Sequence, residues 1–275
     1  MVASLRAALR ANSETREYLG AGRFDSGKSL FFVYALVQHP GPGGHNAMDK
    51  QQLDLMRQRM IAEVVAEAVF LTSQLGKATL SARVIEVMAK IPRHEFVPVE
   101  LQPYAYLNRP LPVGYGKTIS QPFIVALMTD LLEPQPDDVV LEVGAGVGYQ
   151  AAILADLVKQ VHSIEIIEEL GLDAKRRLQR LGYRNVEVRI GNGYYGWPEH
   201  APFDKIMVTA APDLIPPPLI AQLKFGGRMV IPTGIPEKQQ LVLVEKTKNG
   251  KLATRDILRV RFSELEQGGD LAGEA

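Results

Sequence analysis

Cysteine is absent from the 275 residues of this chain. Its absence excludes a disulfide framework, catalysis by a thiolate and any zinc site with cysteine ligands. A chain without cysteine also suits the reducing cytoplasm, which is the compartment that we expect for it. Histidine is scarce, and its spacing is not that of metal ligands, so the sequence predicts no metal site. The five histidines are His39, His45, His94, His162 and His200.

An excess of charge of either sign is also missing. Lysine plus arginine and aspartate plus glutamate both number 31, so the formal net charge is zero. Because nucleic-acid-binding proteins usually carry a basic excess, we expect no nucleic-acid partner. No apolar run approaches the roughly 20 residues of a membrane span, so we expect no membrane partner. With 46% hydrophobic residues the chain can bury a substantial core, but its composition gives no oligomeric state.

The first 47 residues differ in composition from the rest of the chain. They carry four spaced arginines and end in the Pro/Gly-rich sequence GPGGHNA. We expect this leader, residues 1–47, to be flexible and dispensable. Met48 follows it directly and opens a helical pattern, so it is an alternative start of the native chain. Residues 48–275 would then form one domain, with a helical and loop-rich part over 50–120 and a core over 137–263.

Two helices are predicted at the start of that domain. Apolar residues at helical spacing indicate helices over residues 50–72 and 81–90, and Ser81 is a suitable N-cap for the second. The segment from residue 91 to residue 121 is dense in proline and glycine and shows no regular period. Long loops of this kind inside a compact domain are often functional.

The loop-rich segment ends in the sequence GYGKTISQPF, residues 114–123. Pro122 is typical of the first position of a helix, and the apolar residues after it have helical spacing. Ser120 therefore lies at or just before a helix N-terminus, where unpaired N–H groups favour an anion. The local sequence by itself favours a plainer role for Ser120, that of an N-cap.

Strands and helices alternate from residue 137 to residue 263. Strands are expected at 138–144, 161–167, 186–191, 203–211 and 228–232 and in two runs around a turn at Asn249-Gly250, and helices at 149–160, 168–182 and 216–227. This alternation predicts an α/β fold with a doubly wound, mostly parallel seven-stranded sheet, an antiparallel edge strand and an N-terminal helical segment. Ligands of such sheets bind at the carboxyl ends of the strands.

A glycine turn follows the first strand of this core. Gly144, Gly146 and Gly148 form a G-x-G-x-G sequence, in which glycine lets the backbone turn tightly and approach a ligand. A dinucleotide fingerprint needs Gly or Ala where Tyr149 stands, which argues against an NAD(P) dehydrogenase. Glu165 closes the second strand, where a ribose-binding carboxylate belongs. The pattern indicates a nucleotide-type cofactor, although a tight strand–helix connection followed by a surface glutamate would have the same sequence pattern.

Several stretches together resemble the protein-L-isoaspartate O-methyltransferases, a family that uses S-adenosyl-L-methionine. They occur in family order between about residues 81 and 263, and the leader lies outside them. They are IPRHEFVP, AYLNRPLPVGYGKTISQPFIVALMTDLL, VVLEVGAGVGYQAAILA, HSIEI, LGYRNVEVRIGNGYYGWPEHAPFDKIMVTAA, QLKFGGRMVIPTG and RVRF. The glycine turn is shared by many methyltransferases, whereas TISQP and GYYGWPEHAPFD are far more specific. The resemblance implies a Rossmann-like class I methyltransferase.

The resemblance also implies a role for each matching residue. The methionine end of the cofactor would be held by Glu142, Gly144, Gly146 and Gly148, its ribose by Glu165, and its adenine by Asn192 and Gly193. The acceptor would be bound by Thr118, Ser120 and Gln121, with Ser120 as the catalytic hydroxyl. Three positions depart from the family: Asn192 and Asn108 stand where Asp is common, and Lys117 where Gln is usual. The first bears on cofactor affinity and the other two on the choice of substrate.

The implied reaction transfers a methyl group to the free carboxylate of L-isoaspartyl residues in damaged proteins and peptides, with D-aspartyl residues as further candidates. The resulting ester collapses to a succinimide, which reopens partly to normal aspartate. A carboxyl of this kind has a pKa near ~4 and is ionised at neutral pH, so no general base is needed. Two alternatives remain open at this point: methylation of aspartates in a dedicated peptide substrate, and a non-catalytic module that only binds S-adenosyl-L-methionine.

Overall fold

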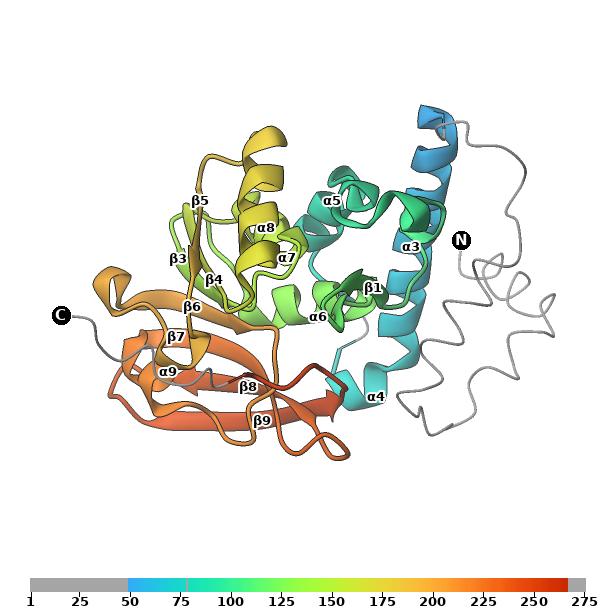
Figure 1. Cartoon of the computed structure of the whole chain (residues 1–275). Helices are drawn as coiled ribbons and strands as arrows, with labels where there is room; N and C mark the ends of the chain where they lie inside the picture. The colour runs from blue at the N-terminus through green and yellow to red at the C-terminus, as the bar shows by residue number, and fades with distance from the viewer. Residues whose placement is uncertain (1–48, 78, 267–275) are drawn as a thin grey trace. The chain divides into compact units, whose positions relative to one another are not determined.

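The computed structural model of the chain describes residues 49–77 and 79–266 (Figure 1). The leader predicted at residues 1–47, with Met48, lies outside these ranges. The described part begins with the helices α3 (Lys50–Phe70), α4 (Thr72–Leu75) and α5 (Ala82–Lys90), which confirms both predicted helices. A capping box starts α3, because the Asp49 carboxylate accepts from the Gln52 N–H at 2.7 Å and the Gln52 side chain accepts from the Asp49 N–H at 3.3 Å. Ser81 lies at the N-cap of α5 but makes no side-chain capping bond.

The segment predicted to lack regular structure contains two 3-10 turns and a hairpin. The turns are η2 (Arg93–Phe96) and η3 (Val99–Tyr104), and the antiparallel hairpin pairs β1 (Leu111–Gly114) with β2 (Lys117–Ile119). The prediction failed because the strands are only four and three residues long and too short to show alternation. Gly114 and Gly116 have φ values of 94° and 68°, and Tyr115 between them has 54°, so this turn needs its glycines.

The predicted seven-stranded sheet is confirmed, with the strand order β5-β4-β3-β6-β7-β8-β9. Its five parallel strands are β3 (Val139–Val143), β4 (Gln160–Glu165), β5 (Val186–Ile190), β6 (Phe203–Val208) and β7 (Leu223–Thr233). Two strands pair in antiparallel fashion at one edge, and they are β8 (Gln240–Lys246) and β9 (Leu252–Arg259). The strand order reverses between β3 and β6, where the chain goes first to one side of β3 and then to the other. Such a switch point is where open α/β sheets bind ligands.

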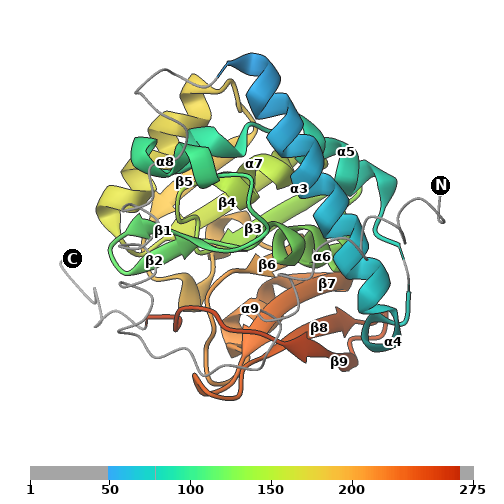
Figure 2. The ribbon, with the colours of Figure 1, turned by 90° about the vertical axis from the view of Figure 1, so that its right-hand side faces the viewer.

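Helices cover both faces of the sheet, as expected for a doubly wound fold. One face packs against α6 (Pro122–Leu132), α7 (Tyr149–Ala155) and α8 (Glu168–Arg180), and the α3 and α5 helices lie against α6 on the same side (Figure 2). The other face packs against α9 (Pro217–Gln222) and the turns η4 (Gly193–Tyr195) and η5 (Pro198–His200). No helix in the described ranges is long and apolar enough to cross a membrane.

Two predicted helices extend less far than the sequence suggested. The first, α7, ends at Ala155, where the Asn185 side-chain amide donates to the Ala155 carbonyl at 2.9 Å and caps it from a distant part of the chain. The helix α9 was predicted to run to residue 227 but ends at Gln222. There Lys246 Nζ donates to the carbonyls of Ile220 and Leu223, at 2.9 and 2.8 Å. Both ends depend on side chains that local sequence patterns do not include.

Candidate active site

A cavity of about 500 Å³ opens at the carboxyl ends of β3, β4 and β6, at the switch in strand order. One wall is formed by the connections after these strands, residues 143–147, 149–150, 164–166 and 209–210, together with residue 193 after β5. We call it the cofactor wall. The opposite wall is formed by the hairpin strand β2 with residues after it, 117–121 and 124–125, and by the late segment 259–266. We call residues 117–121 of that side the acceptor loop. The predicted motifs therefore face one another across a single cavity.

The glycine turn of the cofactor wall has the backbone that the sequence predicted. Gly144, Gly146 and Gly148 have φ values of 94°, 52° and 88°, which favour glycine. A Cβ at Gly144 would lie 2.4 Å from Thr209 Oγ1, so no other residue fits without a shift. Thr209 Oγ1 donates to the Gly144 carbonyl at 2.6 Å and joins the ends of β3 and β6. A Cβ at Gly146 would meet nothing within 4 Å, so the cavity is open beside it.

Glu165 is held at the end of β4 by two main-chain groups. Its Oε2 accepts from the Gly146 N–H at 2.7 Å, and its Oε1 accepts from the Ile167 N–H at 3.0 Å. The residue is buried and lines the cavity. Each oxygen keeps a second lone pair beyond these bonds, so the carboxylate can still accept hydroxyl donors from a ligand. The glycine turn thus fixes the orientation of the acidic group as well as leaving room for a ligand.

Glu142 lies beneath the cavity rather than on its surface. It is fully buried, and it is not among the lining residues. Its Oε2 accepts a hydrogen bond from Ser163 Oγ, and its Oε1 has no hydrogen-bond partner within the part of the chain that is described. Burial raises the pKa of this carboxyl to about 8, with Ser163 opposing that shift and the charge of Glu165 adding to it. This buried carboxyl therefore keeps one oxygen without a hydrogen bond within the described part of the chain, two residues before Gly144 in the sequence.

Of the other residues predicted to bind the cofactor, some line the cavity and some do not. Gly193 lines the cavity, whereas Gly148 and Asn192 do not. The Asn192 Oδ1 accepts from the Tyr194 N–H at 3.0 Å and caps η4, a local bond that an aspartate could also make. Gly193 must be small, because a Cβ there would lie 2.4 Å from Val143 Cγ1.

Ser120 lines the cavity from the acceptor loop and is half-buried. Its carbonyl accepts from Arg93 Nη2 at 2.7 Å, and Arg93 Nε donates to the Ala105 carbonyl at 2.9 Å. Arg93 is fully buried, and its guanidinium lies 4.7 Å above the Tyr149 ring. Burial lowers the pKa of Arg93, and the nearby Tyr149 opposes this. Sequence reasoning missed Arg93 as part of the site, although it lies in the IPRHEFVP stretch.

The interpretation of Ser120 as the N-cap of the next helix is wrong. The N-cap of α6 is Gln121, and Gln121 makes no side-chain capping bond. The capping bond comes instead from Asn108, whose Oδ1 accepts from the Phe123 N–H at 2.9 Å. Because this distant amide satisfies the helix end, the Ser120 hydroxyl is not needed for capping. Pro122 occupies the first turn of α6, as predicted.

A glutamate on α3 supports the acceptor loop from behind. Glu67 Oε2 accepts from Asn108 Nδ2 at 2.7 Å and from Gln121 Nε2 at 3.2 Å. Burial raises the pKa of Glu67, and the two amide donors oppose that shift. The Asn108 amide therefore links α3 to α6, donating to one and accepting from the other. An aspartate at position 108 could not donate to an ionised Glu67, which explains locally why this chain carries Asn there.

The remaining acceptor-loop residues also face the cavity. Thr118 and Gln121 line it, so all three residues predicted to bind the acceptor, with Ser120 as the third, lie on the same side of the cavity. Lys117 lines it too, and its Nζ contacts Glu266 Oε1 at 2.6 Å. That ion pair joins the hairpin to the late segment, and these two form the outer side of the cavity. Lys117, which stands where the family usually has Gln, therefore forms an ion pair with Glu266 in this chain.

Comparisons with known proteins agree on one family. Residues 66–269 match the model of the family described as "Protein-L-isoaspartate(D-aspartate) O-methyltransferase (PCMT)". The chain is 62% identical over 230 residues to Protein-L-isoaspartate O-methyltransferase 1 of Polaromonas sp. strain JS666, covering 84% of this chain and 97% of the relative. It is 55% identical over 239 residues to Protein-L-isoaspartate O-methyltransferase 2 of Syntrophobacter fumaroxidans, covering 86% and 96%. A solved structure named protein-L-isoaspartate O-methyltransferase matches with a TM-score of 0.66 at 30% identity, over 78% of this chain and 67% of that one.

Proposed function

The chain belongs to the protein-L-isoaspartate O-methyltransferase family, and from this premise we propose how its own residues carry out the reaction. The activity is the S-adenosyl-L-methionine-dependent methylation of the free carboxylate of isoaspartyl residues in proteins and peptides. The observation that carries the proposal is the single cavity between a glycine turn with Glu165 on one wall and the acceptor loop with Ser120 on the other.

S-adenosyl-L-methionine fits the residues of the cofactor wall. Gly144 and Gly146 leave the wall without side chains, and the two held oxygens of Glu165 offer free lone pairs to ribose hydroxyls. Glu142, which is buried and mostly protonated at neutral pH, would contribute a hydrogen-bonding group to the methionine end through its unpaired Oε1 rather than a negative charge. Gly193, with Asn192 behind it, would border the adenine. When bound, the cofactor supplies a methyl group on a sulfonium, a carbon that is already activated for transfer.

The acceptor loop supplies position rather than acid–base chemistry. The acceptor carboxylate is ionised at neutral pH, since its pKa is near ~4, and it therefore needs no base. We assign the Ser120 hydroxyl to donate to one oxygen of this carboxylate, which leaves the other oxygen to react. Arg93 holds the Ser120 carbonyl and thereby fixes the residue that carries the hydroxyl. Orientation of this kind contributes up to about 7–11 kcal/mol in model reactions.

Apolar groups around the acceptor loop exclude water from the reacting oxygen. Ile119, Val260, Phe262 and Leu265 line the cavity on this side. A carboxylate that is stripped of its water shell is a better nucleophile, provided that fixed donors replace some of the lost hydrogen bonds. Thr118 and Gln121 are further donors within the same loop, although the Gln121 amide also donates to Glu67. We assign both to binding of the acceptor.

The Ser120 assignment is tested by the Ser120→Ala variant with an isoaspartyl peptide and labelled cofactor. Turnover should fall well over tenfold, while the affinity for S-adenosyl-L-homocysteine in calorimetry stays within about twofold, because the cofactor wall is untouched. Ser81→Ala is the matched control, since Ser81 is exposed, makes no side-chain capping bond and does not line the cavity. Unchanged turnover in Ser120→Ala would remove Ser120 from the mechanism.

The same assay with a panel of acceptors decides the substrate class. Isoaspartyl peptides should be methylated well above matched aspartyl peptides, with D-aspartyl peptides as the third arm. A preference for aspartyl residues of one particular sequence would favour a dedicated peptide substrate instead. Cofactor binding without turnover on any carboxylate would favour a binding module.

A further inference from the structure

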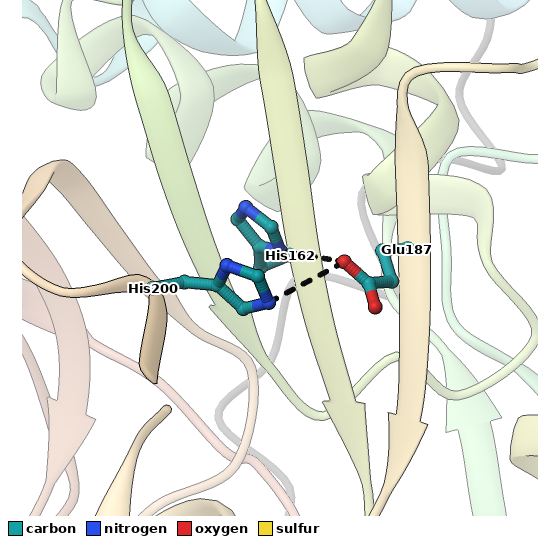
Figure 3. Close-up of side chains that lie close together, drawn as sticks. All are labelled: His162, Glu187 and His200. Atoms are coloured by element: carbon teal, nitrogen blue, oxygen red, sulfur yellow. Dashed lines mark ion pairs between the residues drawn. The ribbon is translucent and has the colours of Figure 1, made fainter. Parts of the chain in front are cut away.

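Two of the five histidines meet a glutamate on the sheet face opposite the glycine-turn helices. His162 on β4 stands directly across from Glu187 on β5, and His200 reaches the same place from η5 (Figure 3). His162 Nδ1 lies 3.2 Å and His200 Nε2 3.5 Å from the same oxygen, Glu187 Oε2. All three ligand atoms lie within 4.8 Å of one another. This cluster was not predicted from the sequence, because the spacing of the histidines is not that of metal ligands.

We propose that His162, Glu187 and His200 form a binding site for a divalent transition metal of the zinc class. Two imidazole nitrogens and one carboxylate oxygen are the donor set that favours zinc, copper, nickel or cobalt over magnesium or calcium, which prefer oxygen. Three protein ligands leave a fourth position for water. This site is separate from the methyltransferase cavity, since none of its three residues lines that cavity.

The distances fit such a site. Metal–ligand bonds of about 2.0–2.2 Å in a tetrahedron place neighbouring ligand atoms about 3.3–3.6 Å apart. The two nitrogen–oxygen distances, 3.2 and 3.5 Å, are close to that edge length. The imidazole rings are stacked, with centroids 3.9 Å apart, so a bound metal requires the two rings to splay. His200 can do this, because it is the exposed member of the pair and lies on a short turn.

The surroundings suit a half-buried metal. The side chain of His162 is only 8% exposed, whereas those of Glu187 and His200 are 52% and 36% exposed and leave one side open to solvent. Trp197 makes T-shaped contacts with both imidazoles, with ring centroids 5.3 and 4.9 Å apart. The nearby cation Arg189 contacts Glu199 Oε2 at 3.3 Å, which offsets its repulsion of a metal. A metal here would fasten η5, and with it the connection that carries Gly193, to two strands of the sheet.

Trp197 is the only tryptophan of the chain and makes the proposal measurable. Full-length protein without an affinity tag is freed of metal by chelation, and its fluorescence is followed as Cu²⁺ or Co²⁺ is added. Either ion bound beside Trp197 should quench its emission in a saturable, one-to-one manner. Zn²⁺ should displace the quencher and raise the melting temperature, and Mg²⁺ should do neither.

Variants decide whether the binding is at this site. Glu187→Gln and His200→Asn, both at exposed positions, should weaken the quenching at least about tenfold while keeping the metal-free melting temperature. Glu86→Gln and His94→Gln are controls that remove an exposed carboxylate and a histidine elsewhere in the chain, and both should bind like the wild type. Absence of saturable quenching, or an affinity in Glu187→Gln and His200→Asn equal to that of the wild type, would show that the three residues hold no metal and would overturn the proposal.

Discussion

The two walls of the active-site cavity are built in different ways. The cofactor wall consists of backbone: a glycine turn at a strand end donates an N–H to Glu165 at the next strand end. The acceptor loop depends on side chains from elsewhere, since Arg93 holds the Ser120 carbonyl and Asn108 caps α6. A short sequence motif specifies the cofactor wall, whereas the acceptor loop depends on residues of other segments that pack behind it. Substitutions in the cofactor wall should therefore lower cofactor affinity, whereas substitutions that disturb the acceptor loop should lower turnover.

The largest difference between the effect on turnover and the effect on cofactor affinity is expected for the Arg93→Met variant. The variant leaves the carbonyls of Ser120 and Ala105 without their buried donor, so the free energy of unfolding should fall by about 2–5 kcal/mol. Turnover should fall as well, because the acceptor loop loses its anchor, while calorimetry should give a nearly unchanged affinity for the cofactor product. Arg83→Met is the matched control: Arg83 also donates to two carbonyls, of Pro134 and Leu157, but outside the cavity. Equal losses of cofactor affinity and turnover in Arg93→Met would break the distinction between the walls.

A second prediction concerns pH and the acid beneath the cofactor wall. Folding raises the pKa of Glu142 from 4.5 to about 8, so the folded state holds this proton more tightly than the unfolded state. Stability therefore falls as pH rises between these values, and the loss is complete above about 8. Glu142→Gln copies the protonated form and removes this dependence. Relative to the wild type, the variant should gain about 4 kcal/mol between pH 5 and pH 9 in urea unfolding without cofactor. Parallel pH profiles of the two proteins would contradict a buried, neutral Glu142.

Gly144→Ala tests the backbone of the cofactor wall. Its φ of 94° and the approach of the new Cβ to Thr209 Oγ1 should lower the free energy of unfolding by about 1–3 kcal/mol. Cofactor affinity should fall at least about tenfold, with turnover at saturating cofactor largely retained. Gly182→Ala provides the control, because Gly182 has a φ of 88° but its Cβ would meet no atom within 4 Å. A turnover defect at saturation without an affinity defect would reverse the assignment of this wall.

The smallest effect is expected behind the acceptor loop. Asn108→Asp keeps the acceptor for the Phe123 N–H but places a second negative charge beside Glu67. The unfolding free energy should fall by about 1 kcal/mol at neutral pH. The loss should shrink as pH falls, because a protonated Glu67 can donate to the new carboxylate. Adding Glu67→Gln should restore stability by supplying that donor at all pH values. A double-mutant cycle by urea unfolding measures the coupling, and simple additivity would exclude it.

The strongly periodic or glycine-marked parts of the chain were predictable. The parallel strands, the glycine turn and the position of Glu165 follow from patterns with a fixed spacing, and the structure confirms them. The short hairpin and the early ends of α7 and α9 were not, because Asn185 and Lys246 cap those helices from far along the chain. The N-cap prediction for Ser120 failed for the same reason, since Asn108 caps α6 in its place.

The fold class and the family could be read from the sequence, because they depend on hydrophobic periodicity and on short motifs, and most but not all of the residues proposed for the site line the cavity. The tertiary structure alone decided what holds Ser120 in place and what lies across the sheet from the glycine turn. Buried donors such as Arg93 find their acceptors only when helices pack. His162, Glu187 and His200 likewise meet only because two parallel strands and a connecting turn bring together three residues that are spread over a segment of 39 residues. Contacts of this kind leave no regular spacing in the sequence, because they form between residues that only the folded chain brings together.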